Sequence, residues 1–427
     1  MTRASDFRST LLIVLDGAAD RPEPELDGGT PLGIAETPFL DSLARNGKGS
    51  LATVLPNGGA PQTHSGMLSL LGYPEVATRA KRGALEGSIV FGGMRPGCLY
   101  ARGNLSSLVQ GRIPSRRVNR DVSQDEADAA TRLLNQRVPE IVGLPCRFTS
   151  YSTYRLAIEL ELGEANVSDE ITGTDPGYAE TEFATPSAQY DFPPVRARAL
   201  SRSPGALHSA DVVNTVTDAC SKVLDAGLDN ESRVAAGRLP VNHVLMRDFG
   251  AGLPEAPSFA TRWGASAKYF HDLPVESGVA RYLGMDEEVA GCSSVTEQAL
   301  GDAGGRLLRD ADRYDLLCFH VKGPDEPGHN GDWREKVDVI ETVDAGLFSL
   351  ISAAFTERND LRVVVTSDHA TCWSVGTHTA DPVPLIVATR NGRDPTLRLS
   401  ERSCAQGTLG IASAWELMPT LFGAGRA

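Results

Sequence analysis

Residues 10–17 read TLLIVLDG, a run of five aliphatic residues bracketed by a threonine and by an aspartate and a glycine. A short continuous apolar run of this kind is typical of a buried strand, and Asp16-Gly17 marks a turn at its end. The stretch TPFLDSLARNG at residues 37–47 begins with a threonine that can cap a helix and closes with glycine. A buried strand followed by a capped helix predicts that the chain opens with an α/β layer.

The same pattern returns in the last third of the chain. DLLCFHV (315–321), LRVVVTSD (361–368) and VPLIVAT (383–389) are near-continuous apolar runs, and residues 333–354 are predicted to be helical. Strands that are apolar along both faces are typical of parallel sheets covered by helices. We therefore expect a parallel-type sheet in an α/β core.

The middle of the chain has a different character. Residues 99–104 and 154–162 alternate more between apolar and polar side chains, and the helix predicted over residues 124–137 is strongly charged. A stretch rich in Pro, Thr and Ser at residues 173–202 is too long for a passive connector, so we expect a functional or partly mobile loop there.

These differences predict two domains. We expect an inserted, smaller α/β domain over residues 88–250, and a discontinuous core domain built from residues 1–87 and 251–427. Each domain is long enough to bury its own hydrophobic core.

Composition narrows the range of partners. The chain has 427 residues, with 41 Lys and Arg against 55 Asp and Glu, which gives a net charge of −14. An acidic surface repels nucleic acid unless a basic patch overrides it, so we expect no nucleic-acid partner. Small anionic substrates stay open, because a few local arginines can dominate a pocket.

The sequence also predicts a cytoplasmic protein. The apolar run near the start, Leu11 to Leu15, is far shorter than the ~20 residues of a membrane span, and the first ten residues lack the pattern of a secretory signal. Seven scattered cysteines, never spaced as C-x-x-C, argue against disulfides or a thiolate zinc site. We expect them to be mostly buried thiols.

Acidic and imidazole side chains follow the predicted strands. The carboxyl ends of parallel strands are where α/β proteins build their sites, so these side chains can meet in space. Their donor atoms are oxygen and nitrogen without sulfur, which favours manganese or zinc, and their number suits two divalent ions. The candidate ligands are Asp16, Asp325, His329, Asp368, His369 and His378. Each Asp–His pair taken alone would more often be a structural feature.

Several stretches carry a resemblance to a known family. They are residues 14–47 (VLDGAADRPEPELDGGTPLGIAETPFLDSLARNG), 68–75 (LSLLGYPE), 319–333 (FHVKGPDEPGHNGDW) and 366–385 (TSDHATCWSVGTHTADPVPL), with looser matches at LYARGN, SRRVNRD, ITGTDP and VLMRDFG. The chain resembles the archaeal-type cofactor-independent phosphoglycerate mutases of the alkaline phosphatase superfamily. The resemblance implies an alkaline-phosphatase-like, metal-bearing α/β core with an inserted smaller α/β cap.

The resemblance also implies how the ligands divide between the metals. Asp325, His329 and His378 would hold one ion, while Asp16, Asp368 and His369 would hold the other together with the nucleophile. In PQTHSGMLSLLGY (61–73) the family serine falls on Thr63, so we expect Thr63 to be the covalent nucleophile and a metal ligand. Ser65 is the alternative if the alignment is shifted. Thr63 can also be interpreted as a helix N-cap.

Basic residues at matching motifs imply recognition of a phosphate and a second anionic group, because planar guanidinium groups bind such oxygens in pairs. The predicted substrate-binding residues are Arg102, Arg116, Arg117, Arg120, Arg247 and Lys322. Asp248 follows Arg247 where the family usually has a small residue. Taken singly, each arginine would more often be solvated.

Other departures concern the reaction. The lysine expected in the family's L-I-K-G-I segment is replaced by Ser277, and the expected G-A-T-G turn reads GCSS at residues 291–294. A mutase must hold its substrate in a water-free site, and the lost lysine weakens that interpretation.

We therefore expect first a hydrolase of a small phosphate, phosphonate or nucleotidyl ester in a specialised pathway. A phosphomutase, of phosphoglycerate or a related acid, is the alternative, and a noncatalytic role is the third possibility. Motifs of acyl hydrolases, P-loop enzymes and dinucleotide oxidoreductases are missing from the sequence.

Overall fold

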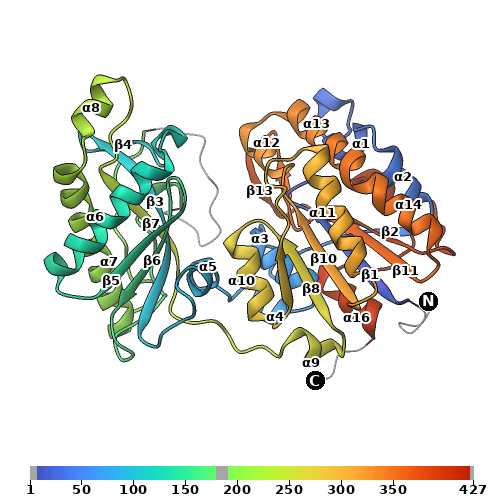
Figure 1. Cartoon of the computed structure of the whole chain (residues 1–427), viewed down its shortest axis with the longest axis horizontal. Helices are drawn as coiled ribbons and strands as arrows, with labels where there is room; N and C mark the ends of the chain where they lie inside the picture. Colours follow the sequence, from blue (N-terminus) through green and yellow to red (C-terminus); the bar gives the residue numbers. More distant parts are fainter. Residues whose placement is uncertain (1–6, 179–190, 424–427) are drawn as a thin grey trace. The chain divides into compact units, whose positions relative to one another are not determined.

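The computed structural model describes residues 7–178 and 191–423, and the chain divides into two compact units (Figure 1). The first unit comprises Met1–Arg79 and Glu255–Ala427, and the second comprises Ala80–Pro254. The sequence prediction placed these boundaries after residues 87 and 250. The Pro-rich stretch predicted to be a functional loop falls partly outside the described residues, at positions 179–190.

The first unit is built on one sheet whose central strand is the TLLIVLDG segment. Parallel pairing joins β1 to both β10 and β11, β10 to β8, and β8 to β9. The strands run in the order β2, β14, β11, β1, β10, β8, β9. Their bounds are β1 Ser9–Leu15, β2 Gly47–Ala52, β8 Ala267–His271, β9 Asp286–Val289, β10 Leu316–Val321, β11 Leu361–Thr366 and β14 Val383–Ala388.

The direction expected for the last strand was wrong. β14 pairs antiparallel with β11, and β2 pairs antiparallel with β14. All six residues of β14 are buried, and this burial explains its continuous apolar run. Hydrophobicity along a strand reports that both faces are covered, which an antiparallel strand inside a covered sheet also satisfies.

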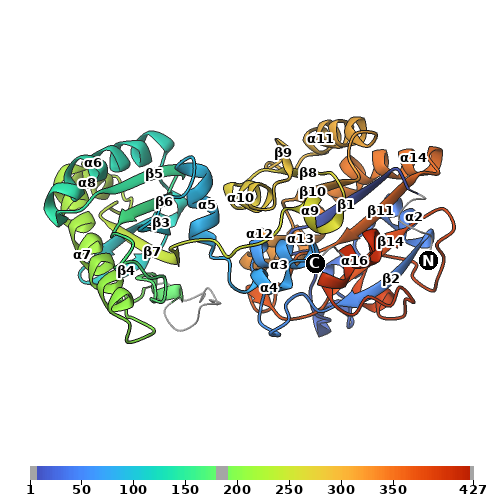
Figure 2. The ribbon, with the colours of Figure 1, turned by 90° about the horizontal axis from the view of Figure 1, so that it is seen from below.

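Helices cover both faces of this sheet. The helices α2 (Pro38–Arg45), α11 (Glu297–Asp310), α13 (Trp333–Val343) and α14 (Ser349–Glu357) share one hydrophobic core with alternate residues of β1, namely Leu11, Ile13 and Leu15. Figure 1 shows α11, α13 and α14 near one another in the first unit, and Figure 2 shows α11 and α14 along one side of its sheet. The remaining helices are α1 (Pro31–Ile34), α3 (Thr63–Leu70), α4 (Pro74–Ala77), α9 (Phe259–Trp263), α10 (Pro274–Tyr282), α12 (Asp325–Asn330), α15 (Glu401–Cys404) and α16 (Leu417–Phe422).

The helix expected over residues 333–354 is interrupted by a π-helical turn at Asp344–Phe348 and extends to Glu357. By length and composition alone the run Trp333–Glu357 could cross a membrane. Ile340, Leu347 and Ile351 of this run are buried in the core of the first unit, which explains its hydropathy.

The second unit has an antiparallel sheet. β3 (Cys98–Val109) pairs with β4 (Arg112–Ser115), β6 (Arg155–Glu161) and β7 (His243–Gly250), and β5 (Cys146–Ser152) pairs with β6. The long helices α6 (Gln124–Val142) and α7 (Pro204–Gly227) bury their apolar sides against one face. The shorter helices are α5 (Arg82–Val90) and α8 (Asn230–Ala235). The second unit therefore has its own α/β core.

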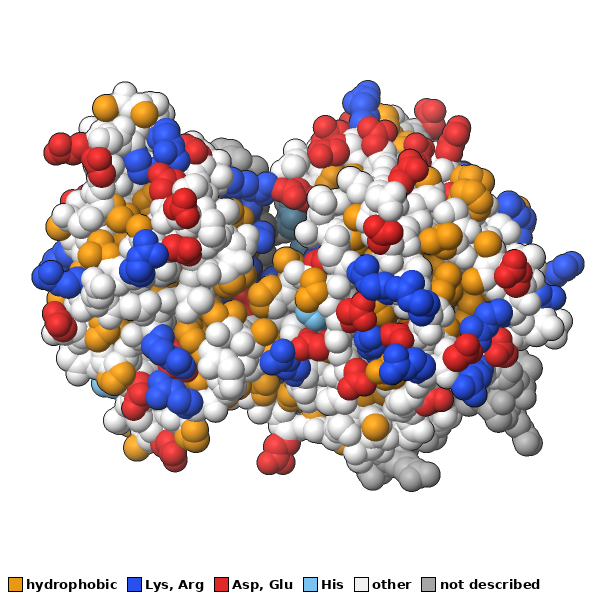
Figure 3. Space-filling view, viewed as in Figure 1, with side chains coloured by type: hydrophobic (Ala, Val, Ile, Leu, Met, Phe, Trp, Pro, Cys, Tyr) orange, Lys and Arg blue, Asp and Glu red, His pale blue; other side chains and the backbone are white. Residues whose placement is uncertain are grey.

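The charged side chains of the surface and the state of the cysteines can be compared with what the composition predicts. Acidic and basic side chains are interspersed over the face of the first unit drawn in Figure 3. All seven cysteines are buried and none is in a disulfide, as the sequence predicts.

Candidate active site

The predicted metal ligands of the first unit lie at the carboxyl ends of its parallel strands. Asp16 follows β1, and Asp368 and His369 follow β11. Gly17 (φ 58°) makes the turn after Asp16, and any side chain there would collide with Thr371 and Asp325. The apolar strands thus deliver these acids to one edge of the sheet.

Asp325 and His329 are carried by α12, which follows β10. Asp325–Asn330 forms a short helix, although its Pro and Gly residues are more typical of a loop. Pro327 lies in its first turn, where a missing N–H costs no hydrogen bond, and Gly331 ends it in the left-handed conformation. The helix places His329 Nε2 at 3.5 Å from Asp325 Oδ1, one turn away.

His369 joins two groups of ligand atoms. Its Nε2 lies 3.3 Å from Asp16 Oδ1 and 3.3 Å from Asp368 Oδ2. Its ring also stacks on His378 at 3.7 Å between centroids, and Asp325, His369 and His378 form a second group within ion-binding reach. His378 Nε2 lies 3.4 Å from Asp325 Oδ1 and 3.2 Å from His329 Nε2. The six predicted ligands therefore come together.

Each of the three imidazole rings forms a hydrogen bond through Nδ1 and turns its Nε2 toward the cluster. His378 Nδ1 donates to the Pro61 carbonyl at 2.8 Å, and His329 Nδ1 donates to the Gly376 carbonyl at 3.1 Å. Thr371 Oγ1 donates to Asp325 at 2.6 Å, so it accepts from His369 Nδ1 at 3.1 Å. Because Nδ1 carries the proton in each neutral ring, the Nε2 lone pairs point into the cluster.

This arrangement fits divalent cations. His369 Nε2 and Asp16 Oδ1 are buried without a hydrogen-bond partner, and they lie side by side. In the absence of an ion, burial lowers the pKa of His378, but Asp325 outweighs burial and raises it to about 9. Burial lowers the pKa of His329. Buried acceptors that converge without donors are a common feature of metal sites.

Lys322 and His320 flank this cluster. Lys322 Nζ donates to Asp16 Oδ2 at 2.5 Å and lies 2.9 Å from Glu276 Oε1. His320 Nε2 lies 3.2 Å from Asp368 Oδ2. Burial lowers the pKa of Lys322, yet Asp16 and Glu276 outweigh burial and raise it above its ordinary value. Lys322, predicted to bind substrate, is therefore held as an ammonium group beside Asp16.

Thr63 is the first residue of α3, and Gln62 is its N-cap, so the interpretation of Thr63 as the N-cap was wrong. Pro61, two residues earlier, accepts the hydrogen bond from His378. A side chain at Gly66, one turn later, would collide with the backbone of Asp368. The buried Thr63 thus lies on a segment that touches both ligand groups. Ser65, the alternative nucleophile, bonds to the backbone N–H and C=O of Gln62.

All five predicted arginines lie in the second unit, and three of them surround acidic side chains. Arg102 and Arg247 face each other across β3 and β7. Arg102 lies 3.0 Å from Glu86 and 3.3 Å from Asp248. Arg116 and Arg247 both bind Asp175, at 2.8 and 2.9 Å, and both stack on the ring of Tyr178. Burial raises the pKa of Asp175, but the two guanidinium groups outweigh burial, so the pKa is lowered below its ordinary value.

Arg117 differs from its neighbours. Its guanidinium forms no ion pair within residues 7–178 and 191–423, and burial together with Arg247 and Arg116 lowers its pKa. The next three residues, Val118, Asn119 and the exposed Arg120, all have positive φ (48°, 53° and 57°). A left-handed β-branched residue is rare, so the turn that presents Arg117 is strained.

Comparisons with known proteins match the whole chain. The profile of the metalloenzyme superfamily matches residues 8–423. The 2,3-bisphosphoglycerate-independent phosphoglycerate mutase of Aeropyrum pernix is 32% identical over 96% of this chain and 97% of its own. That of Methanopyrus kandleri is 32% identical over 97% and 96%. The chain belongs to the metalloenzyme superfamily, within the family of these archaeal phosphoglycerate mutases.

Solved structures agree with this membership of the metalloenzyme superfamily. The cofactor-independent phosphoglycerate mutase from Thermoplasma acidophilum is 25% identical with a TM-score of 0.59, and covers 97% of this chain and 99% of its own. The PH0037 protein from Pyrococcus horikoshii shares the fold, with a TM-score of 0.76 at 23% identity over 99% of both chains. The resemblance and the alkaline-phosphatase-like fold class predicted from the sequence are confirmed. This metalloenzyme is a metal-dependent phosphoryl-transfer enzyme.

The departures from the family pattern lie away from the ligand atoms. Ser277, at the position of the expected lysine, donates its hydroxyl to Glu287 on β9. The backbone N–H groups of Gly291 and Cys292, in the GCSS turn, donate to Asp272. Neither segment supplies an atom to the cation groups of this metalloenzyme.

Four residues that hold predicted site residues in place were not predicted from the sequence. Glu276, His320 and Thr371 hold the predicted ligands or their neighbours, and Asp175 holds two arginines. Thr371 lies two residues after His369, and His320 lies two residues before Lys322, so their position in the sequence was a usable signal. Glu276 lies far from the predicted ligands in sequence, and only the fold of the first unit brings it close to their neighbours His320 and Lys322. Asp175 likewise meets its two arginines only through the fold of the second unit.

Proposed function

We propose that this enzyme is a phosphomutase that moves a phosphoryl group between two oxygens of a small phosphorylated carboxylic acid, such as phosphoglycerate. The observation that carries the proposal is the convergence of three imidazole Nε2 atoms and three carboxylates on one cluster, beside the first turn of α3. Full-length similarity to phosphoglycerate mutases supports the same reaction.

We propose that the cluster holds two divalent ions, manganese or zinc. Asp325, His329 and His378 would hold one, and Asp16, Thr63, Asp368 and His369 the other. Bound there, such ions would stabilise the negative charge that develops on phosphoryl oxygens. Oxygen and nitrogen donors without sulfur suit these metals.

Thr63 is the proposed nucleophile. Its Oγ1 would form a bond to phosphorus while the bond between phosphorus and the substrate oxygen breaks, and the proton lost by Thr63 would pass to that oxygen. Return of the group to the other hydroxyl would reverse these changes. As the first residue of α3, Thr63 lies at the positive end of the helix dipole, which favours the charge of a phosphoryl group.

Lys322 and the arginines of the second unit would recognise the anionic groups. The ammonium of Lys322 beside Asp16 supplies positive charge to the cluster. Arg117, whose charge has no acidic partner among the described residues, is the best candidate to bind the substrate carboxylate, supported by Arg102, Arg116, Arg120 and Arg247. A small phosphorylated metabolite of the cytoplasm is the proposed substrate.

A hydrolase is the second candidate. The sequence alone favours it, because Ser277 replaces a lysine. Glu276, which lies beside Lys322, favours it further by reducing the positive charge available to a phosphoryl group. However, Lys322 still supplies an ammonium group to the cluster, which supports the mutase.

The two reactions are separated by one assay. Protein reconstituted with manganese or zinc is incubated with 3-phosphoglycerate, and both 2-phosphoglycerate and inorganic phosphate are measured. We expect 2-phosphoglycerate without release of phosphate. Phosphate released from 3-phosphoglycerate or a generic ester, with no isomer formed, would establish the hydrolase instead.

A further inference from the structure

Glu276 is a fully buried carboxylate at the third position of α10, and its two oxygens have separate partners. Oε2 accepts hydrogen bonds from the backbone N–H groups of Asp272 (3.0 Å) and Leu273 (3.2 Å), which caps the helix. Oε1 lies 3.2 Å from His320 Nδ1 and 2.9 Å from Lys322 Nζ. One oxygen therefore serves the helix, and the other faces two basic side chains of β10 and the segment after it.

Each of these two basic side chains reaches a carboxylate of the cation cluster. His320 Nε2 lies 3.2 Å from Asp368 Oδ2, and Lys322 Nζ lies 2.5 Å from Asp16 Oδ2. The other oxygen of Asp16, Oδ1, is buried without a hydrogen-bond partner beside His369 Nε2. The position of the Lys322 ammonium thus decides which oxygen of Asp16 faces the cluster.

We propose that Glu276 is a positioning residue of the cation site. It holds His320 against Asp368 and Lys322 against Asp16, and so sets the orientation and the charge of the Asp16, Asp368 and His369 group. This inference rests on the cation site proposed above, but on neither the mutase nor the hydrolase reaction. Partners of ligand residues commonly tune metal affinity in this way.

A role in capping α10 alone would explain the contacts of Oε2 but not those of Oε1 with His320 and Lys322. Capping of α10 needs only one acceptor oxygen, which a glutamine also provides. A glutamine that kept the cap would turn its NH₂ group toward His320 and Lys322, so donor would face donor. The Glu276→Gln variant therefore retains the cap and loses the interaction with the cluster.

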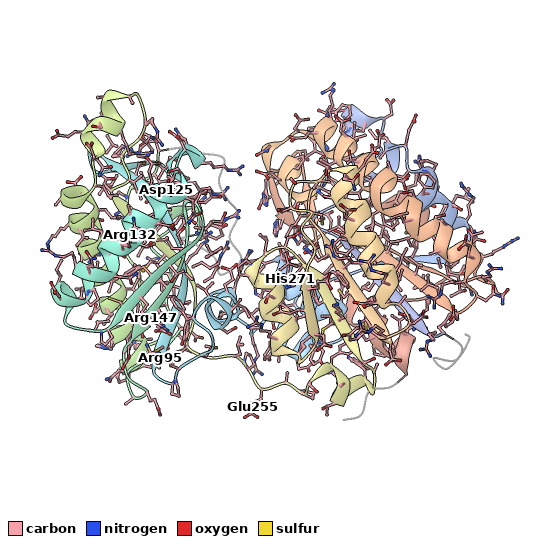
Figure 4. The ribbon with its side chains drawn as sticks, viewed as in Figure 1. Arg95, Asp125, Arg132, Arg147, Glu255 and His271 are labelled. Carbon is pink, nitrogen blue, oxygen red and sulfur yellow. The ribbon has the colours of Figure 1, made fainter. Side chains whose placement is uncertain are left out.

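The test is a calorimetric titration of metal-free, full-length protein with Mn²⁺ and no substrate. We expect the wild type to bind two ions, and Glu276→Gln to bind one of them at least tenfold more weakly while the other is unchanged. Glu287→Gln is the matched control, because Glu287 lies near α10 and bonds to Ser277 and to His271 at the end of β8 (Figure 4). It should leave both affinities unchanged.

Two further variants keep the result decisive. Glu276→Asp keeps the charge but withdraws the carboxylate from His320 and Lys322, so it should show the same site-selective loss even if Glu276→Gln fails to fold. In a Lys322→Gln background the effect of Glu276→Gln should shrink, since the two residues act together. If the Glu276 variants bound Mn²⁺ at each of the two sites as tightly as the wild type does, the inference would be overturned. A wild type that binds fewer than two ions would overturn the two-cation proposal itself.

Discussion

The chemistry of single residues in the first unit depends on which atom of each side chain is left without a partner. Asp16 gives Oδ2 to Lys322 and keeps Oδ1 toward His369, and each cluster histidine donates through Nδ1. The orientation of the histidines is set by Pro61, Gly376 and Thr371, and that of Asp16 by Lys322; none of these four is a predicted metal ligand. Ligand geometry is thus set by neighbours that a list of ligands omits.

Thr63 gives the first prediction. Thr63→Ala should lower turnover by at least 10³-fold, about 4 kcal/mol of barrier, because no other hydroxyl takes its place. Thr63→Ser should retain activity, since the nucleophilic oxygen is kept. Mass spectrometry of acid-quenched enzyme should find phosphate on Thr63. Phosphate on Ser65, or on no residue, would contradict the assignment.

Arg117 gives the second prediction. Arg117→Gln should raise KM for a phosphorylated carboxylic acid about tenfold or more, because a charge-assisted contact contributes roughly 1.5 to 3 kcal/mol. Steady-state kinetics check this. Arg132→Gln, at an exposed position of α6 (Figure 4), is the control and should leave KM unchanged. An unchanged KM in Arg117→Gln would remove this residue from the binding site.

At the scale of elements, the sequence predicted strands better than their directions. The runs of β1, β10, β11 and β14 were found because burial on both faces leaves a plain apolar signature. The antiparallel direction of β14 and the helical form of Asp325–Asn330 were missed, because each depends on contacts distant in sequence. The candidate ligands were predicted from their position after strands, whereas the role of Glu276 follows only from its contacts with His320 and Lys322.

The third prediction concerns a buried charge pair that ties three elements together. Lys336 of α13 is fully buried and donates to Asp20 at 2.7 Å and to the carbonyls of Ala19 and Thr371. Lys336→Met should reduce the free energy of unfolding by about 3 to 5 kcal/mol, because Asp20 is left buried without its cation. Urea unfolding followed by tryptophan fluorescence measures the loss. Lys48→Met, an exposed site on β2, should change it little. An equal reduction of the free energy of unfolding in the two variants would argue against a stabilising role of the Lys336–Asp20 pair.

The fourth prediction concerns pH and the contact of β7 with α7. Burial lowers the pKa of His243 to about 4, and its Nδ1 lies 2.6 Å from Ser221 Oγ. The unfolded chain takes up the proton near pH 6.5 and the folded one only near pH 4, so stability falls as pH drops through this window. From pH 7 to pH 5 the loss from this group is about 2 kcal/mol. His243→Gln should lack that part of the loss, as measured by circular dichroism in urea at both pH values. The same pH dependence in the variant would exclude His243 as its source.

At the scale of the whole molecule, the predicted site residues and the hydrophobic cores are distributed over two units. The predicted cation ligands all belong to the first unit. The predicted substrate-binding residues, except for Lys322, belong to the second, and each unit has a separate core. The four tryptophans, Trp263, Trp333, Trp373 and Trp415, all belong to the first unit. Fluorescence therefore reports on the unit with the cation site, while circular dichroism reports on both.

The last prediction uses this asymmetry. Mn²⁺ at 100 times its dissociation constant should stabilise the first unit by about 2.7 kcal/mol for each independent ion, because it binds the folded state and the assembled ligands are absent from the unfolded chain. The midpoint of urea unfolding seen by tryptophan fluorescence should rise with Mn²⁺, and a chelator should reverse the rise. Asp325→Asn and Asp368→Asn should each lose about half of the stabilisation, because each removes a carboxylate from a different ligand group. If either variant kept the full shift, or if Mn²⁺ left the wild-type midpoint unchanged, the cluster would not be a two-ion site.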